Sequence, residues 1–208
     1  MTVDGKPLFV IYNPRKLPDS RRVTDLWREL AVKSGLSGLF LVAEYYGTTW
    51  DPCLAGYDAV VTVRLPPLRR QWVPWTRPME KLEGKIRFWT GRPAIYQYDE
   101  CIDRLVGDAV QGIESFPCVV PNFDNTPRSG PDGLVLHGST PDGFRRHIRR
   151  ALHRLGNVPR EHSIVFVKSW NEWAEGNHLE PDLKFGLRYL EALRDELEAG
   201  DRRGARTP

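Results

Sequence analysis

The sequence predicts an α/β fold in which short buried strands alternate with amphipathic helices around a parallel sheet. Short, uninterrupted apolar runs recur along the chain, as expected for strands that are buried on both faces. Most of these runs are separated by apolar residues spaced three or four apart, which is the period of a helix. Of the 208 residues, 40% are hydrophobic and 11% aromatic. That composition supports a core and excludes a disordered, collagenous or coiled-coil chain.

The predicted elements follow in order along the chain. Five apolar runs predict strands at residues 8–12, 39–43, 59–63, 118–120 and 164–167. A first helix is predicted around residues 23–31, with Asp19 or Ser20 placed to cap its start and Gly35 to end it. Three further helical stripes cover residues 102–113, 144–155 and 183–197. Residues 64–97 are predicted to form a long loop that includes Trp72 and Trp75.

Five strand–helix units are too few for a closed eight-stranded barrel, which takes about 250 residues. The chain is therefore predicted to be either an open five-stranded sheet or the back portion of a barrel whose first three units are missing. We expect one domain over residues 1–199, followed by a disordered basic tail over residues 200–208.

Charge and cysteine content restrict the partners and the compartment. The 30 Lys and Arg against 27 Asp and Glu leave a net charge of +3, too little for a nucleic-acid-binding field. An arginine stripe over residues 145–154 is therefore interpreted as a solvated helix face. No apolar run approaches the roughly 20 residues of a membrane span, and the start lacks the pattern of a secretory signal. Three cysteines without a CxxC pair favour a reducing compartment, so a cytoplasmic location is expected.

The segment SWNEWAEG at residues 169–176 is the strongest local signal for chemistry. It follows the last predicted strand, at the end where α/β proteins bind ligands. If the segment makes one helical turn, Glu172 and Glu175 have Cβ atoms about 5–6 Å apart on one face. Two carboxylates that close are expected to differ in pKa, which supplies the acid and the base of glycosidic chemistry. Trp170 and Trp173 offer flat apolar faces for a sugar ring.

The same segment has a structural alternative. Ser169 and Glu172 also match a capping box, in which case the acidic residues stabilise a helix start without a catalytic role. Gly176 and Pro181 argue against a long helix at this place. The sequence alone leaves both interpretations open.

Other polar and aromatic residues follow the predicted strands at the same edge. Asp124, Asn125 and Arg128 are able to bind sugar hydroxyls or an acidic group, although the segment is equally typical of a plain turn. The five histidines show no metal-ligand spacing, so no metal and no cofactor is implied. The candidate substrate-binding set is Trp170, Asn171, Trp173, Tyr12, Glu44, Tyr45, Asp124, Asn125, Arg128 and His178.

The segments VDGKPLFVIYNPRKLPD, IYQYDE, VVPNFDNTPR and SWNEWAEGNHLEPD resemble, in this order, the carboxyl-terminal portion of a known domain. This is the glycoside hydrolase family 99-like domain, also described as the WbsX-type glycosyltransferase domain of bacterial polysaccharide and lipopolysaccharide biosynthesis. The resemblance runs from residue 3 to about residue 197. NEWAEG followed by LEPD is its most specific part.

The resemblance implies a (β/α)8 barrel of the TIM type, incomplete, with about the last five units present. It implies catalysis by Glu172, as the base that activates the substrate's own 2-hydroxyl, and by Glu175, as general acid/base. An oligosaccharide or polysaccharide is the implied substrate, with a sugar donor possible and no cofactor. Hydrolase members carry His at the position of Ala174, so transfer and hydrolysis both stay open.

Two alternatives to a working enzyme remain. In the first, the chain is a truncated fragment, which only binds sugar or needs a partner fragment to complete the barrel. In the second, it is a doubly wound domain of unrelated function.

Overall fold

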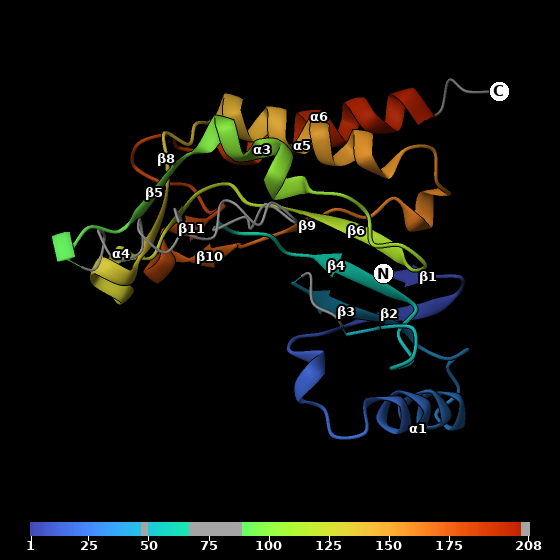
Figure 1. The fold of residues 1–208 in the computed structure, drawn as a ribbon. Coiled ribbons are helices and arrows are strands. Elements are labelled where there is room, and N and C mark those ends of the chain that lie inside the picture. The colour runs from blue at the N-terminus through green and yellow to red at the C-terminus, as the bar shows by residue number, and fades with distance from the viewer. Residues whose placement is uncertain (47–49, 67–88, 205–208) are drawn as a thin grey trace. The chain divides into compact units, whose positions relative to one another are not determined.

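A computed structural model of the chain describes residues 1–46, 50–66 and 89–204 as a mixed α/β fold (Figure 1). Its contacts divide the chain into two units. The first unit comprises Met1–Val63, Val106–Cys118 and Ala151–Phe166. The second comprises Arg64–Leu105, Val119–Arg150 and Val167–Pro208. Trp72 and Trp75 lie outside the described residues.

A six-stranded sheet, in the order β1-β2-β3-β4-β6-β9, organises the first unit (Figure 1). Strands β2, β3, β4 and β6 pair in parallel, and β1 pairs with β2 in the antiparallel sense. This confirms the predicted parallel sheet. The strands are β1 Thr2–Val3, β2 Lys6–Ile11, β3 Phe40–Tyr45, β4 Ala59–Thr62, β6 Glu114–Val119 and β9 Phe166–Val167.

Both faces of this sheet are covered by apolar side chains, which explains the uninterrupted apolar runs. Along β3, Phe40 and Val42 belong to one core cluster, and Leu41 and Ala43 belong to another. Successive side chains of a strand point to opposite faces, so each cluster lies on its own face. Residues 39–43 must therefore be apolar at every position.

The first helix, α1 Ser20–Lys33, begins and ends close to the predicted signals. The Asp19 side chain accepts a hydrogen bond from the Arg22 N–H, as expected of an N-cap. Gly35 follows with a φ of 85°, a left-handed conformation that favours glycine at a helix end. Two short 3₁₀ helices complete this unit, η1 Pro14–Lys16 and η3 Arg160–His162.

The second unit contains shorter strands that the apolar runs do not predict. A three-stranded sheet has the order β5-β8-β7, and a small hairpin pairs β10 with β11. Its strands are β5 Ala94–Gln97, β7 Phe123–Asp124, β8 Leu134–His137, β10 Asn171–Glu172 and β11 Asn177–His178. Its short helices are α4 Thr126–Ser129, η2 Gly130–Asp132 and η4 Trp173–Glu175.

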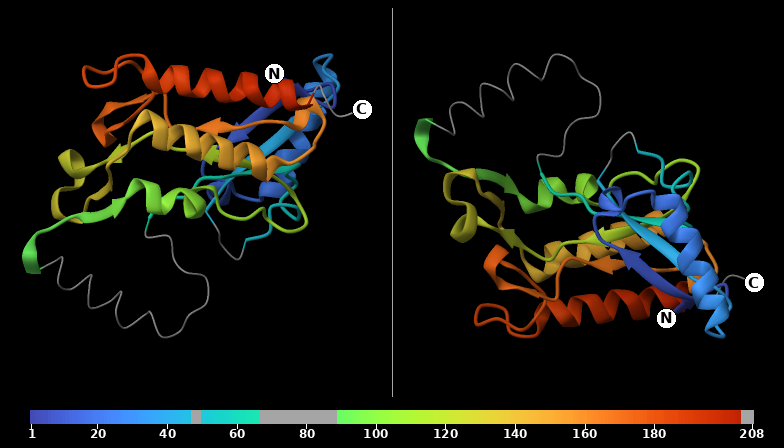
Figure 2. Two further views of the ribbon diagram at one scale, coloured as in Figure 1. Left: turned by 90° about the horizontal axis from the view of Figure 1, so that it is seen from above. Right: turned by 90° about the horizontal axis from the view of Figure 1, so that it is seen from below.

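Three long helices, α3 Tyr98–Val106, α5 Pro141–Leu155 and α6 Arg188–Gly204, run side by side, with α5 between the other two (Figure 2). The arginine stripe of α5 pairs with acidic residues of both neighbours. Arg146 contacts Asp99 of α3 at 2.7 Å, and Arg149 contacts Glu196 of α6 at 2.7 Å. The stripe therefore joins helices, which the interpretation as a solvated face did not anticipate.

A closed (β/α)8 barrel is not confirmed. Among the described residues, the six-stranded sheet has two open ends, at β1 and β9. Strand β4 pairs directly with β6, because β5 pairs with β8 in the other sheet. In a (β/α)8 barrel each strand pairs with the next strand along the chain. Here β5 is absent from its place between β4 and β6, so the strand order is not that of a barrel.

Two helix boundaries differ from the prediction. Helix α3 ends at Val106, followed by Gly107 at a φ of 59°, so its predicted extension to residue 113 is wrong. Val110 and Ile113 instead pack against a core cluster of the first unit. Helix α6 begins at Arg188, after the fully exposed Leu183, and continues to Gly204, into the segment predicted to be a tail. None of the helices in the described chain combines the length and the apolar character needed to cross a bilayer.

Candidate functional site

The two candidate glutamates lie on a small hairpin of the second unit, formed by residues 169–178 and called here the glutamate hairpin. Glu172 ends β10 and pairs with Asn177 of β11. Glu175 ends the 3₁₀ helix η4, whose turn is closed by the Gly176 N–H bonded to the Trp173 carbonyl at 3.0 Å. The two carboxylates therefore stand at the two ends of one tight turn rather than on a longer helix.

Ser169 links the two strands of the glutamate hairpin. Its Oγ accepts the Glu172 N–H at 3.1 Å and donates to the Asn177 carbonyl at 3.2 Å. The first bond is the backbone half of the capping box considered in the sequence. In this setting it fixes the backbone of Glu172 at the end of a strand.

Asn177 anchors the hairpin to the chain around it, and the sequence analysis did not single it out. Its side chain is fully buried, and its Nδ2 donates to the carbonyls of Asn122 at 2.6 Å and Lys168 at 2.8 Å. Asn122 returns the contact, because its Oδ1 accepts the His178 N–H at 2.9 Å. An asparagine beside two catalytic candidates is a weak signal in a sequence, since asparagine is common in turns.

Gly176 brings the hairpin against β7. Its φ of 50° lies in the left-handed region. A Cβ at this position would lie 3.1–3.2 Å from the backbone and Cβ of Asp124. A glycine is therefore required both by the backbone angle and by the close approach.

Arg128 is the polar residue of the second predicted cluster that reaches the glutamates. Its Nη1 lies 3.0 Å from Glu175 Oε1. The Arg128 side chain is 62% exposed and that of Glu175 is 22% exposed. The guanidinium thus covers one oxygen of the candidate acid from the solvent side.

Asp124 and Asn125 make local bonds instead. Asp124 Oδ1 accepts both the N–H and the hydroxyl of Thr126, at 2.9 and 2.6 Å. Asn125 Oδ1 accepts the Leu134 N–H at 2.7 Å. These bonds match the plain turn that was the alternative interpretation of this segment.

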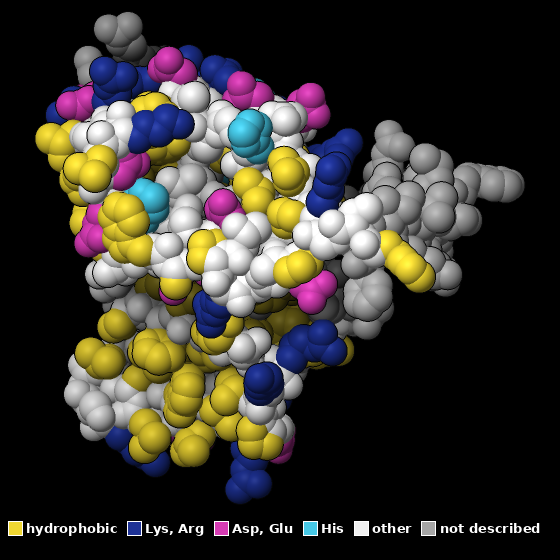
Figure 3. Space-filling view, turned by 90° about the vertical axis from the view of Figure 1, so that its left-hand side faces the viewer, with side chains coloured by type: hydrophobic (Ala, Val, Ile, Leu, Met, Phe, Trp, Pro, Cys, Tyr) yellow, Lys and Arg dark blue, Asp and Glu magenta, His cyan; other side chains and the backbone are white. Residues whose placement is uncertain are grey.

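The aromatic residues of the hairpin differ in how they are held. Trp173 stacks on His178 with ring centroids 3.7 Å apart, and its Nε1 donates to Glu180 Oε2 at 2.7 Å. Trp170 is held by its backbone, since its carbonyl accepts the N–H groups of Leu179 and Glu180. Both indoles remain about half exposed. In the view of Figure 3, apolar side chains are interspersed with charged side chains and histidines.

Of the remaining candidates, Asn171 is an exposed residue of β10 that pairs with His178 in the second unit. The other three, Tyr12, Glu44 and Tyr45, lie in the first unit. Glu44 and Tyr45 end β3 and line a cavity of about 120 Å³. The cavity is lined by Asn13, Pro14, Arg15, Glu44, Tyr45, Tyr46 and Trp50. Tyr12 is exposed and is not among these residues.

Glu44 and Tyr46, which both line this cavity, are hydrogen-bonded to each other. Its Oε1 accepts the Tyr46 hydroxyl, while its Oε2 is buried and has no hydrogen-bond partner within the described part of the chain. Burial, followed by the bond and the charge of Glu44, raises the pKa of Tyr46 well above its usual value. Tyr46 therefore stays a hydrogen-bond donor to Glu44.

Comparison with known proteins gives a consistent family. The family model described as "Glycosyltransferase WbsX" matches residues 1–193. "Uncharacterized protein WxcX" of Xanthomonas campestris pv. campestris strain B100 is 31% identical over 199 residues, which are 95% of this chain. WxcX of strain ATCC 33913 is 31% identical over 204 residues. The chain spans 28% of the length of these two relatives.

A solved structure titled "Glycoside hydrolase-like protein" is similar in fold. The TM-score is 0.54 at 19% sequence identity, and the match covers 94% of this chain and 55% of that one. At this identity the likeness concerns the fold alone.

Proposed function

Because this chain belongs to the WbsX glycosyltransferase family, we propose that it acts on glycans, with Glu172 and Glu175 as the acid/base pair of glycosyl transfer or glycosidic hydrolysis. The family and the glycoside hydrolase-like fold support a carbohydrate-active role. Within that role, we propose an oligosaccharide or polysaccharide as substrate. A place in bacterial polysaccharide or lipopolysaccharide biosynthesis is part of the same proposal.

The glutamate hairpin is the observation that carries this proposal. Its backbone is fixed by the bonds of Ser169 and Asn177, so the two carboxylates are held at the ends of one turn. Catalytic groups held in a fixed geometry lower the entropic part of a reaction barrier.

The two glutamates take different parts in the proposed reaction. Glu172 accepts the proton of the substrate's 2-hydroxyl, whose oxygen then attacks the anomeric carbon. Glu175 donates a proton to the glycosidic oxygen as that bond breaks, which leaves a sugar whose 2-oxygen is bonded to its anomeric carbon. In the second step the oxygen of the incoming group attacks the anomeric carbon and gives its proton to Glu175. The bond between the 2-oxygen and the anomeric carbon breaks, and Glu172 returns its proton to the 2-oxygen. The incoming group is a sugar in transfer and water in hydrolysis. Arg128, which bonds Oε1 of Glu175, leaves the other oxygen for this exchange or moves aside when substrate binds.

Sugar contacts are proposed for the aromatic rings of the hairpin. Trp173 is held in place by His178 and Glu180, so it presents a preordered apolar face. Trp170 presents a second exposed indole. The remaining candidates, Asn171, Asp124 and Asn125, are proposed to contact substrate hydroxyls, as are Tyr12, Glu44 and Tyr45 on the first unit.

The test is turnover of a panel of oligosaccharides and nucleotide sugars by the variants Glu172→Gln and Glu175→Gln. Each is expected to lose about 10²- to 10⁴-fold in rate, as is typical when general acid–base catalysis is removed. Glu29→Gln is the matched control, because Glu29 is an exposed glutamate of α1. Full activity in both hairpin variants would contradict the proposal.

A second candidate function is sugar binding without turnover, or activity only together with a partner fragment. The open ends of the six-stranded sheet in the described part of the chain, at β1 and β9, favour it, because unpaired strand edges are places where another chain pairs. Calorimetric binding of an oligosaccharide without any turnover would support this candidate. Turnover by the isolated chain would exclude it.

A further inference from the structure

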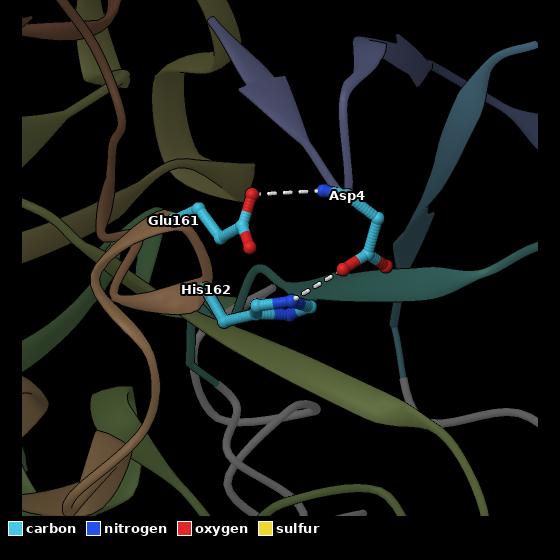
Figure 4. Close-up of side chains that lie close together, drawn as sticks. All are labelled: Asp4, Glu161 and His162. Atoms are coloured by element: carbon cyan, nitrogen blue, oxygen red, sulfur yellow. Dashed lines mark hydrogen bonds and ion pairs between the residues drawn. The ribbon is translucent and has the colours of Figure 1, made fainter. Parts of the chain in front are cut away.

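A cluster of metal-ligating side chains lies in the first unit, among residues that the proposed function does not use (Figure 4). Asp4 occupies the turn between β1 and β2, and Glu161 and His162 belong to η3. One ligand atom from each of the three residues lies within 4.8 Å of the other two. Asp4 is 157 and 158 residues from its two partners, so a search for local spacing does not detect the cluster.

The His162 ring is held in one orientation. Its Nδ1 lies 2.8 Å from Oε1 and 3.0 Å from Oε2 of Glu114, on β6. The Phe40 ring packs against it edge-on, with centroids 6.2 Å apart. A carboxylate that accepts the Nδ1–H of a histidine leaves Nε2 as the free ligand atom, which is the usual second sphere of a metal-bound histidine.

Nε2 of His162 faces the two remaining carboxylates. It lies 3.3 Å from Asp4 Oδ1, and Glu161 Oε2 accepts the backbone N–H of Asp4 at 2.9 Å. The Asp4 backbone has a φ of 51°, and the Gly5 carbonyl next to it accepts the Ser37 hydroxyl. The two carboxylates therefore lie close to Nε2 of His162, one from the β1–β2 turn and one from η3.

We propose that Asp4, Glu161 and His162 bind a divalent transition metal ion of the Zn²⁺ type, which ties the β1–β2 turn to η3. One imidazole and two carboxylates are ligands that Zn²⁺ accepts at about 2.0–2.2 Å, whereas Ca²⁺ and Mg²⁺ prefer oxygen alone. Ligand atoms on a tetrahedral Zn²⁺ lie about 3.4 Å apart, so the three side chains, whose ligand atoms lie within 4.8 Å of one another, close by up to about 1.4 Å when the ion binds. Two of the three residues are exposed, which leaves room for water as a fourth ligand.

The effect of the ion is expected to be structural. A ligand that binds only the folded state raises its stability, and at 100 times its dissociation constant the melting temperature is expected to rise by about 5–10 °C. Because the ion joins segments at opposite ends of the first unit's sequence, chelation is expected to loosen β1 first. This inference does not depend on the glutamate hairpin, and activity is not its readout.

The test is titration of the metal-free full chain with Zn²⁺ by calorimetry, and with Co²⁺ by visible absorption. All variants carry Cys53→Ser, because the exposed Cys53 thiol is itself a Zn²⁺ ligand. One ion per chain is expected to bind, with affinity falling at least tenfold in Glu161→Gln and in Asp4→Asn. Glu114→Gln, which touches no ligand atom of the ion, is expected to weaken binding about 10- to 100-fold.

Asp25→Asn is the matched control. Asp25 is an exposed carboxylate of α1 that pairs with Arg21 at 2.9 Å. Its loss is expected to leave Zn²⁺ affinity unchanged. The absence of saturable binding, or equal affinity in the parent chain and in Glu161→Gln, would overturn the proposal and leave the cluster as a hydrogen-bonded clamp.

Discussion

The two units of the chain position their candidate site residues by different means. In the first unit, Glu44 and Tyr45 continue a parallel strand whose direction is set by the hydrogen bonds of the sheet. In the second, Glu172 and Glu175 flank a turn whose shape depends on side-chain bonds from Ser169 and Asn177. The strand end is held by main-chain hydrogen bonds, whereas the turn depends on a few polar side chains. The two units are therefore expected to respond differently to mutation.

The largest effect on stability is expected from the core of the first unit. Phe116 is fully buried and contacts the rings of Phe40 and Phe166, with centroids 6.4 and 6.1 Å away. Phe116→Ala is expected to lower the free energy of unfolding by about 3–5 kcal/mol. Urea denaturation measures it, with Leu26→Ala as a control at a half-exposed position. An effect no larger than that of the control would contradict this account of the core.

Acid is expected to destabilise the second unit through His147. This side chain is fully buried, and its Nδ1 lies 3.0 Å from the Tyr98 hydroxyl. Burial lowers the pKa of His147 to about 4, although a hydrogen bond to the Val120 backbone acts in the opposite direction. The unfolded chain binds the proton near pH 6.5 and the folded chain near pH 4. Stability is therefore full above pH 6.5 and falls by about 3 kcal/mol as the pH decreases to about 4.

The difference in stability between the parent chain and His147→Gln, followed from pH 7 to pH 4, isolates this contribution. Glu196 serves as the internal contrast. Burial opposes ionisation of Glu196, but bonds to Arg149 and Arg145 outweigh it and lower its pKa below 4.5. The stability that ionised Glu196 contributes is therefore lost only at more acidic pH than that of His147. A parent chain and a His147→Gln variant with parallel pH profiles would show that His147 is not the group responsible.

Asn177→Ala is expected to combine an intermediate loss of stability with a loss of function. The substitution leaves the carbonyls of Asn122 and Lys168 without their donor, at an expected cost of about 1–3 kcal/mol. Because the hairpin loses its anchor, the turnover rate is expected to fall much more than the fraction of folded protein does. Thr140→Ala is the comparison, because Thr140 Oγ1 accepts one backbone bond, from the Gly143 N–H, and lies outside the proposed site. Equal turnover rates in the two variants would show that Asn177 does not position the glutamates.

Gly176→Ala is expected to have the smallest effect on stability, about 1–2 kcal/mol, from strain at a φ of 50° and from the close approach to Asp124. Thermal melting measures it. Gly112→Ala is a control with a φ of 79° but nothing near its Cβ, so the difference between the two variants reports the contact with Asp124.

The parts of the fold that depend on local pattern were predictable. The apolar runs predicted β2, β3 and β4, and Asp19 and Gly35 predicted the ends of α1. The sheet of β5, β7 and β8 was not predicted, because its strands are short and β5 alternates half-buried and exposed residues instead of forming an apolar run. The end of α3 was missed because the apolar period continues past Gly107 into residues that pack without a helix.

The sequence marks the residues of the candidate site but not the contacts that hold them. SWNEWAEG marks the two glutamates, since acidic and aromatic residues follow an apolar run. The bond of Arg128 to Glu175 spans 47 residues and that of Asn177 to Asn122 spans 55. Such contacts depend on how the chain returns on itself, which no local period encodes. The cluster of Asp4 and His162 was not predicted for the same reason, because the two residues are 158 positions apart.

The most direct test of the account measures oligosaccharide binding and turnover on the same Glu175→Gln preparation, after a cooperative melt has been confirmed. We predict a dissociation constant within a few-fold of the parent chain and a turnover rate at least about 100-fold lower, since the carboxylate acts in the reaction and not in holding the hairpin. An unchanged turnover rate, or a loss of folding in place of a loss of chemistry, would contradict the assignment of Glu175.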